Sequence, residues 1–234
     1  MIFTRLDFDE LGSTNTEAAA RAKAGAPEGL IVTTKCQTSG RGRQGRRWQG
    51  GRGNLYMSLV LRPALPVRMF GQISFVASLS LAEVLESYGL AVQLKWPNDI
   101  LVNGAKIAGI LPETEQNWLV LGIGLNVMET PQVEGRVVTS LAEEGAVVPT
   151  EDVLLALQQK LLHWYDAWQR DGFPSVRAAW LARATGMGQR VEVVLAEGQK
   201  VCGVMEALDD EGALIVRDDE NRPQRIFSGE VFFA

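Results

Sequence analysis

The segment from Lys35 to Arg52 has the composition of an anion-binding loop. It contains six cationic side chains and no acidic one, whereas the rest of the 234-residue chain holds 17 bases and 28 acids. Its glycines could turn backbone N–H groups toward a ligand, and the arginines between them offer planar forks for carboxylate or phosphate oxygens. Trp48 could add an aromatic face for a base or a ring. One basic loop on an acidic body indicates an anion site rather than general solubility charge.

A solvated, flexible loop would have the same composition as this segment. So would an Arg/Gly tract that binds single-stranded nucleic acid. The acidic remainder of the chain argues against nucleic acid, whose footprint usually extends along a whole face. A Walker loop is excluded, because no Gly-Lys-Ser/Thr ends the segment and no helix clearly follows it.

A second polar group, KWPND, occupies residues 95–99. A proline extends the residue before it, and Asn98 and Asp99 favour a turn, so structure alone could explain these residues. An amide and a carboxylate at a strand end could also hold Mg²⁺ or polarise an incoming amine. Lys106 follows soon after, and a lysine beside a hairpin turn is ordinarily solvated. Gly109, three residues on, indicates that a backbone or ligand approaches closely there.

A Gly-X-Gly motif at Gly122 and Gly124 follows an expected strand. The third glycine of a dinucleotide-binding fingerprint is absent, since Val127 takes its place, and Pro131 prevents a long helix. We therefore expect a sheet edge that comes close to a ligand or to a neighbouring strand.

Hydrophobic periodicity predicts an α/β body that positions these groups. A helix is expected to open near Ser13, where Thr14 and Glu17 have capping-box spacing. Asn103-Gly104 is the preferred dipeptide of a type I′ hairpin. Further strands are expected at residues 30–34, 54–61, 92–96, 100–102, 106–111 and 118–122, and helices at 72–87, 152–170 and 176–184.

The hydrophobic period changes to two after Gly186. Strands are expected at residues 190–195, 200–208, 213–217, 224–227 and 230–233, separated by turn-rich segments. Five short strands in so short a tail predict a small barrel. We therefore expect two domains, residues 1–186 and 187–234.

The overall composition, with 46% hydrophobic and 22% charged residues, is that of an ordinary globular protein. No apolar run approaches the roughly 18 residues needed to cross a bilayer, and the N-terminus lacks a secretory signal pattern. Cys36 and Cys202 lie far apart, and the single histidine, His163, falls on an amphipathic helical pattern. Neither a disulfide framework nor a His/Cys metal site is expected, and a reducing cytoplasm suits the chain best.

The order of these segments resembles the biotin protein ligases. The matching segments are GSTN (12–15), QTSGRGRQGRRW (37–48), KWPNDILVNGAKIAGIL (95–111), GIGLNV (122–127) and the small β tail. The resemblance implies an α+β domain with a mixed, largely antiparallel sheet of the class II synthetase type, followed by a C-terminal SH3-like barrel. It also implies that ATP and Mg²⁺ convert biotin to biotinyl-5′-AMP, and that biotin then passes to a lysine of a biotin carboxyl carrier protein.

The same resemblance implies roles by motif position. Biotin would be bound by Ser13, Thr14, Asn15, Gln37, Gly40, Arg41, Gly42, Arg43, Lys106, Gly109, Gly122 and Gly124. ATP would be bound by Arg43, Arg46, Trp48, Asn98, Asp99, Lys106 and Asn126. Lys106, Asp99 and Arg41 would be catalytic, and Asp99 would also face the metal. Positive charge is needed because a carboxylate must attack a phosphate and both are anions.

The chain departs from the family pattern at both ends. Some relatives carry an N-terminal DNA-binding domain, whereas the ligase motifs here begin about a dozen residues in. We therefore expect a monofunctional enzyme, a monomer or homodimer, with no DNA or membrane partner. Some relatives also place near Ala234 an arginine that reaches the active site. Lipoate protein ligase is the nearest alternative function, and the Gly/Arg loop argues against it.

Overall fold

A seven-stranded mixed sheet forms the main part of the computed structural model, which describes residues 1–115, 117–196 and 198–233. Ala234, near which some relatives place an arginine, lies outside the described residues. The strand order is β1 (Thr4–Phe8), β2 (Leu30–Thr34), β3 (Leu55–Leu61), β7 (Trp118–Leu125), β6 (Ala105–Glu115), β5 (Asp99–Val102) and β4 (Val92–Lys95). Only β1 and β2 run parallel among these pairs. The expected largely antiparallel sheet is confirmed, and β1 is a strand that hydrophobic periodicity did not predict.

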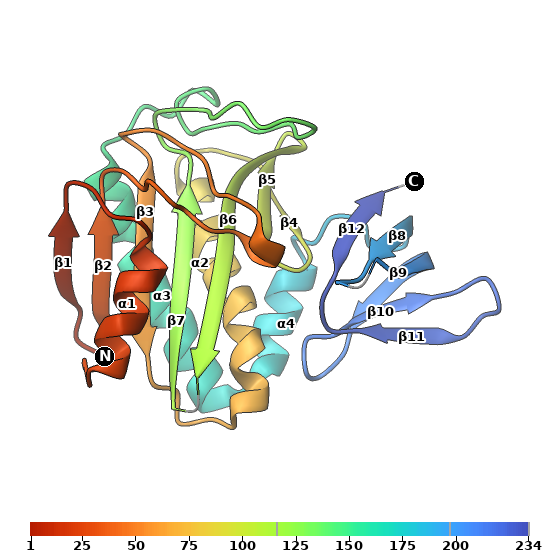
Figure 1. Ribbon diagram of the computed structural model, residues 1–234. Helices are drawn as coiled ribbons and strands as arrows, with labels where there is room; N and C mark the ends of the chain where they lie inside the picture. Colours follow the sequence, from red (N-terminus) through yellow and green to blue (C-terminus); the bar gives the residue numbers. More distant parts are fainter. Residues whose placement is uncertain (116, 197, 234) are drawn as a thin grey trace.

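Helices cover both faces of this sheet (Figure 1). On one face lie α2 (Ile73–Ser87), α3 (Thr150–Asp171) and α4 (Phe173–Leu181), and on the other lies α1 (Thr14–Lys23). Two short 3₁₀ segments, η1 (Arg43–Gly45) and η2 (Val67–Gln72), precede β3 and α2. Every residue of β3 is buried because the strand is covered on both sides.

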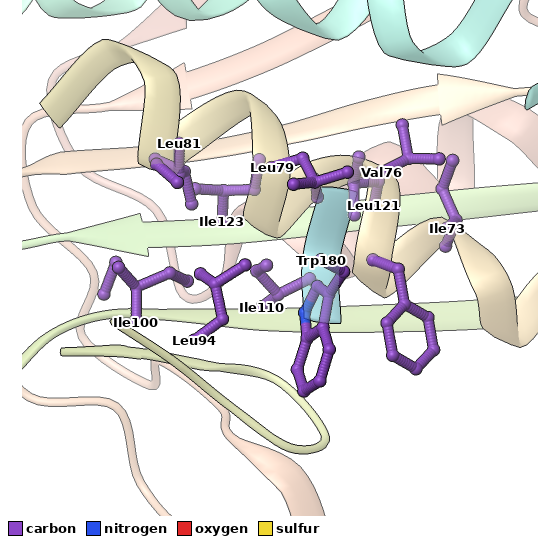
Figure 2. Packing of buried hydrophobic residues seen from close by; sticks show 14 of the residues in the cluster. Ile73, Val76, Leu79, Leu81, Leu94, Ile100, Ile110, Leu121, Ile123 and Trp180 are labelled. Atoms are coloured by element: carbon purple, nitrogen blue, oxygen red, sulfur yellow. The ribbon is translucent and has the colours of Figure 1, made fainter. Parts of the chain in front are cut away.

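The main core lies between α2 and the sheet (Figure 2). Ile73, Val76 and Leu79 of α2 are buried there with Leu121 and Ile123 of β7. The segment Val67–Ser87 is long and apolar enough to pass for a membrane span by length and composition alone. However, 78% of its apolar window is buried inside the protein, as in the core helix of a folded domain.

The β5–β6 hairpin has the predicted turn. Asn103 and Gly104 both have positive φ angles, 51° and 78°, as a type I′ turn requires. The register then shifts between Ile100 and Leu101, so that one more residue of β6 is fitted opposite β5. Three residues along a regular strand would place Lys106 and Gly109 on opposite faces. The irregularity brings both to the face of Asp99.

The C-terminal segment forms a five-stranded antiparallel sheet. Its order is β11 (Pro223–Ile226), β10 (Leu214–Arg217), β9 (Lys200–Leu208), β8 (Arg190–Val194) and β12 (Glu230–Phe233). The expected SH3-like β tail is confirmed, although its sheet is not closed, because β11 and β12 are edges that do not pair with each other in the described residues. Val191, Met205 and Leu214 belong to the same hydrophobic cluster as α2. The sheet therefore packs against the main body, and the domain boundary at Gly186 remains a prediction.

Candidate active site

A cavity of about 80 Å³ lies on the face of the sheet that carries α1. It is bounded by the start of α1, the loop of residues 37–53 and strands β5, β6 and β7. Nearly all of the site residues expected from the sequence meet on its wall. The expected residues on the wall are Ser13, Thr14, Asn15, Gln37, Arg41, Gly42, Arg43, Arg46, Trp48, Asn98, Asp99, Lys106, Gly109, Gly122 and Gly124.

Gly40 and Asn126 lie behind the wall rather than on it. A Cβ at Gly40 would come within 2.6 Å of the Trp48 carbonyl oxygen, so a glycine is needed for the loop to close on itself. Asn126 is buried, donates from Nδ2 to the Thr139 carbonyl and leaves Oδ1 without a partner in the described structure. That unpaired acceptor is a buried polar group of the kind that a ligand or water satisfies.

The cavity wall is strongly cationic. Six cationic side chains face one acidic one, Asp99, among the described wall residues. Two of the six, Arg47 and Arg136, were not among the residues assigned from the sequence. Arg136 comes from the segment after β7, where it is an isolated arginine and gave no local signal. The wall therefore suits an anion, or two anions brought together.

Lys106 and Asp99 form an ion pair inside this wall. Lys106 Nζ donates to Asp99 Oδ1 at 2.5 Å, and the two side chains are only 17% and 22% exposed. The hairpin and its irregular register set the distance between them. A partly buried, paired lysine is the kind of group that stabilises developing negative charge.

The basic loop is folded back on itself. Gly42 N–H donates to the Arg46 carbonyl, and Trp48 N–H donates to the Gly40 carbonyl. These amides are therefore used within the loop, and the expectation that the amide of Gly42 turns toward a ligand is wrong for this conformation. The arginine side chains supply most of the positive charge of the wall.

Trp48 lies against two glycines of the cavity wall. A Cβ at Gly109 would come within 2.8 Å of Trp48 Cζ3, and one at Gly124 within 2.7 Å of Cζ2. Lys106 Nζ lies 5.5 Å from the centre of a Trp48 ring, and Trp48 Nε1 is buried without a partner in the described structure. The indole thus covers the glycine wall that the sequence assigned to biotin. Ligand pockets usually measure about 300 Å³ or more, and a ligand that occupies this glycine wall would have to displace the indole ring.

Hydrogen bonds fix the floor of the cavity. Ser58, fully buried on β3, has its Oγ 2.6 Å from Asn15 Oδ1 and 2.8 Å from Thr14 Oγ1. Thr14 N–H donates to Gln37 Oε1 at 2.8 Å. The expected capping box is wrong, since no side chain caps α1 and Thr14 is used in this network. A Cβ at Gly122 would collide with Asn15 Oδ1, so that glycine makes room for Asn15.

The C-terminal sheet holds the basic loop from the other side. Arg43 donates to Ser228 Oγ at 2.9 Å and to Asn98 Oδ1 at 3.3 Å. Glu230 Oε1 accepts from both Arg46 and Arg136 at 2.7 Å.

The ionisation of these groups reflects their surroundings. Burial lowers the pKa of the Arg43 guanidinium. Burial opposes ionisation of Glu230, but the Arg46 hydrogen bond and the charges of Arg46 and Arg136 keep its pKa below the ordinary value. Glu230 is therefore an ionised link between the C-terminal sheet and the loop.

With this geometry in view, the family is clear. Residues 9–127 match the Biotin/lipoate A/B protein ligase family, and residues 186–234 match the Biotin protein ligase C terminal domain. The chain belongs to the biotin protein ligase family.

Similar proteins span nearly the whole chain. A biotin–acetyl-CoA-carboxylase ligase of Mycobacterium tuberculosis is 36% identical over 234 residues, covering 95% of this chain and 86% of the relative. A biotin–acetyl-CoA-carboxylase ligase of Paracoccus denitrificans is 37% identical, and the match covers 95% of this chain and 97% of the relative. The structure of a biotin protein ligase from Aquifex aeolicus in complex with biotin and ATP superimposes with a TM-score of 0.86. The two sequences are 26% identical, and the superposition covers 100% of this chain and 99% of the other.

Proposed function

We propose that this chain is an ATP-dependent biotin–protein ligase that forms biotinyl-5′-AMP and transfers biotin to a lysine of a carrier protein. The observation that carries the proposal is the cavity in which six cations face Asp99, with the Lys106–Asp99 pair on its wall. The relatives named biotin–acetyl-CoA-carboxylase ligase support this substrate and the carrier domain of that carboxylase as acceptor.

In the first step, a biotin carboxylate oxygen attacks the α-phosphorus of ATP. The bond from that phosphorus to the bridging oxygen of the β-phosphate breaks, and pyrophosphate leaves with the electron pair. Arg41, Arg43 and Lys106 screen the two anions as they approach and stabilise the charge that develops between them. Arg46 and Asn98 would contact the nucleotide, and Asn126 would lie behind them.

The residues at the other end of the cavity bind the ring of biotin. Ser13, Thr14, Asn15 and Gln37 supply hydroxyl and amide groups for the ureido ring of biotin, and Gly109, Gly122 and Gly124 form the flat wall beside it. The Trp48 ring moves off this wall when the ligand enters and then covers the ligand.

In the second step, the ε-amine of the acceptor lysine attacks the biotinyl carbonyl carbon. The mixed anhydride bond breaks, AMP leaves as an anion and the amine loses a proton. Asp99 is the acid group on the wall that can accept this proton. Lys106, which donates to Asp99 before the reaction, orients the Asp99 carboxylate.

Mg²⁺ fits this site only through the nucleotide. The described residues contain no cluster of three or more His, Cys, Asp or Glu side chains able to hold a metal by themselves. Mg²⁺ is commonly bound by one or two carboxylates together with substrate phosphates. Asp99 would supply the carboxylate, and the metal would screen the phosphate charge.

We further propose a cytoplasmic enzyme, a monomer or homodimer, without a DNA ligand. Transfer to protein tests the function directly. Purified protein incubated with ATP, Mg²⁺, biotin and a carrier domain should add one biotin to that domain, seen as a mass increase on its target lysine. Lipoate in place of biotin should give none. Attachment of lipoate alone would favour lipoate ligase, and salt-dependent binding of single strands without adenylate formation would favour a nucleic-acid protein.

A further inference from the structure

A continuous chain of hydrogen bonds joins the cavity floor to the basic loop. It runs from Gln37 through Thr14, Ser58 and Asn15 to the carboxylate of Glu113. Glu113, near the end of β6, then accepts from Arg41 of the loop at 3.0 Å. One oxygen, Glu113 Oε2, receives both Asn15 Nδ2, at 2.8 Å, and Arg41.

Glu113 allows only one of the two orientations of the Asn15 side-chain amide. The two N–H groups of Asn15 Nδ2 point to Glu113 Oε2 and to the Leu111 carbonyl, both of which can only accept. A reversed amide would set its oxygen against two acceptors, so the nitrogen must face β6. Asn15 Oδ1 therefore faces Ser58, as the structure shows.

The orientation of the Asn15 amide also sets the direction of the next hydrogen bonds, toward the ligand side of the cavity. Ser58 has one hydroxyl proton, and Asn15 Oδ1 takes it at 2.6 Å. The Ser58 oxygen is then left as an acceptor toward Thr14. Gln37 Oε1 accepts the Thr14 N–H, so Gln37 Nε2 faces away from α1. The direction of the Ser58 and Thr14 hydroxyls thus follows from where Asn15 points, whereas the Thr14 backbone N–H orients Gln37 by itself.

We propose that Glu113 is a positioning residue that sets the hydrogen-bond polarity of the ring end of the cavity and holds Arg41 over that end. The inference rests on the proposed function, because it deepens how that site selects a cyclic urea. Glu113 touches neither the ring nor the reacting atoms. It acts through Asn15 and through the loop.

Two substitutions separate the acceptor of Glu113 from its charge. Glu113→Leu removes the acceptor, whereas Glu113→Gln keeps an acceptor oxygen and removes the charge. Glu115→Leu, at an exposed position two residues along the same strand, is the matched control. Ser58→Ala breaks the chain at its buried middle without touching the loop. Thermal midpoints identify any variant that fails to fold.

Calorimetry with two ligands gives the readout. One ligand is biotin, and the other is its alcohol, in which the carboxylate is reduced, so that it reports on the ring end alone. Glu113→Leu and Ser58→Ala should weaken binding of the alcohol about tenfold or more, the loss expected when a buried hydrogen bond, or a partly buried one to a charged group, is removed. Glu113→Gln and Glu115→Leu should stay within about threefold of wild type, and the KM for ATP should stay within about twofold in all folded variants.

Equal losses in Glu113→Leu and Glu113→Gln would show that only charge matters and would overturn the inference. Unchanged binding of the alcohol by Glu113→Leu would overturn it as well. Both results leave the proposed function standing, provided that the wild-type protein binds biotin. A wild-type protein that binds no biotin would contradict the proposed function and the inference together.

Discussion

Lys106 Nζ donates to Asp99 Oδ1 at 2.5 Å across the β5–β6 hairpin, and this pair lies on the wall of the cationic cavity. The irregular register of β6 is what turns both side chains to one face. The pair joins the two proposed steps, since Lys106 serves adenylate formation and Asp99 serves the incoming amine.

Replacing Lys106 should impair the first step far more than it impairs folding. Lys106→Met keeps the length of the side chain and removes its charge, so the developing charge at the reacting phosphate loses a donor. We expect adenylate formation to fall by about 10² or more, the loss typical of removing one such donor. Single-turnover formation of biotinyl-AMP measures this. Lys35→Met removes the charge of an exposed lysine in the same way, and this variant should behave as wild type.

The contact of Glu230 with Arg46 and Arg136 should show a specific pH dependence. The pKa of Glu230 is lower in the folded protein than its ordinary value of 4.5. The ion pair therefore stabilises the folded protein when the pH is above 4.5, and this contribution is lost as the pH falls through the lower, folded-state pKa. The groups are partly exposed, so Glu230→Gln should cost about 1 kcal/mol or less at neutral pH.

Urea unfolding of wild type and Glu230→Gln between about pH 3 and 7 tests that sign. The difference in unfolding free energy should be largest near neutrality and should vanish in acid. Glu220→Gln, an exposed change in the turn between β10 and β11, is the control. A difference that grows as the pH falls would refute the assignment.

Gly122 should tolerate no side chain. Its Cβ would collide with Asn15 Oδ1, so Gly122→Ala must push Asn15 from its hydrogen bonds. We expect the KM for biotin to rise about tenfold or more while the KM for ATP changes little. Gly71→Ala is the matched control, because nothing lies within 4 Å of the added Cβ. Equal KM values in the two variants would argue against this role.

Trp48 should report ligand entry. Its ring covers Gly109 and Gly124, so a ligand that occupies this wall must change the surroundings of the indole. Biotin should change the tryptophan fluorescence of wild type, and Trp48→Phe should abolish most of that change. Trp164→Phe, on α3, should retain it. A full response in Trp48→Phe would mean that the ring does not move.

Local patterns identified much of this site. The Asn103-Gly104 turn, the Gly/Arg loop and the glycines of β7 are contiguous in sequence, and each has its own chemical signature. Ser58 was missed, although a lone polar residue in a fully buried strand always needs a partner. That signal could have found it.

The other omissions came from long-range packing. Glu113 and Glu230 acquire their contacts only when β6 and β12 meet the basic loop, and Arg136 acquires its contact only when the segment after β7 meets β12. No spacing within the chain encodes such a meeting. Alternation in the tail likewise predicted the strands but not whether β11 and β12 would close a barrel, because closure depends on sheet geometry rather than on local pattern.

Exchange of labelled pyrophosphate into ATP tests the central claim most directly. Wild-type protein with Mg²⁺ should catalyse this exchange only when biotin is added, and Lys106→Met should reduce it by about 10² or more. Exchange that requires lipoate instead of biotin, or no exchange with either acid, would contradict the account.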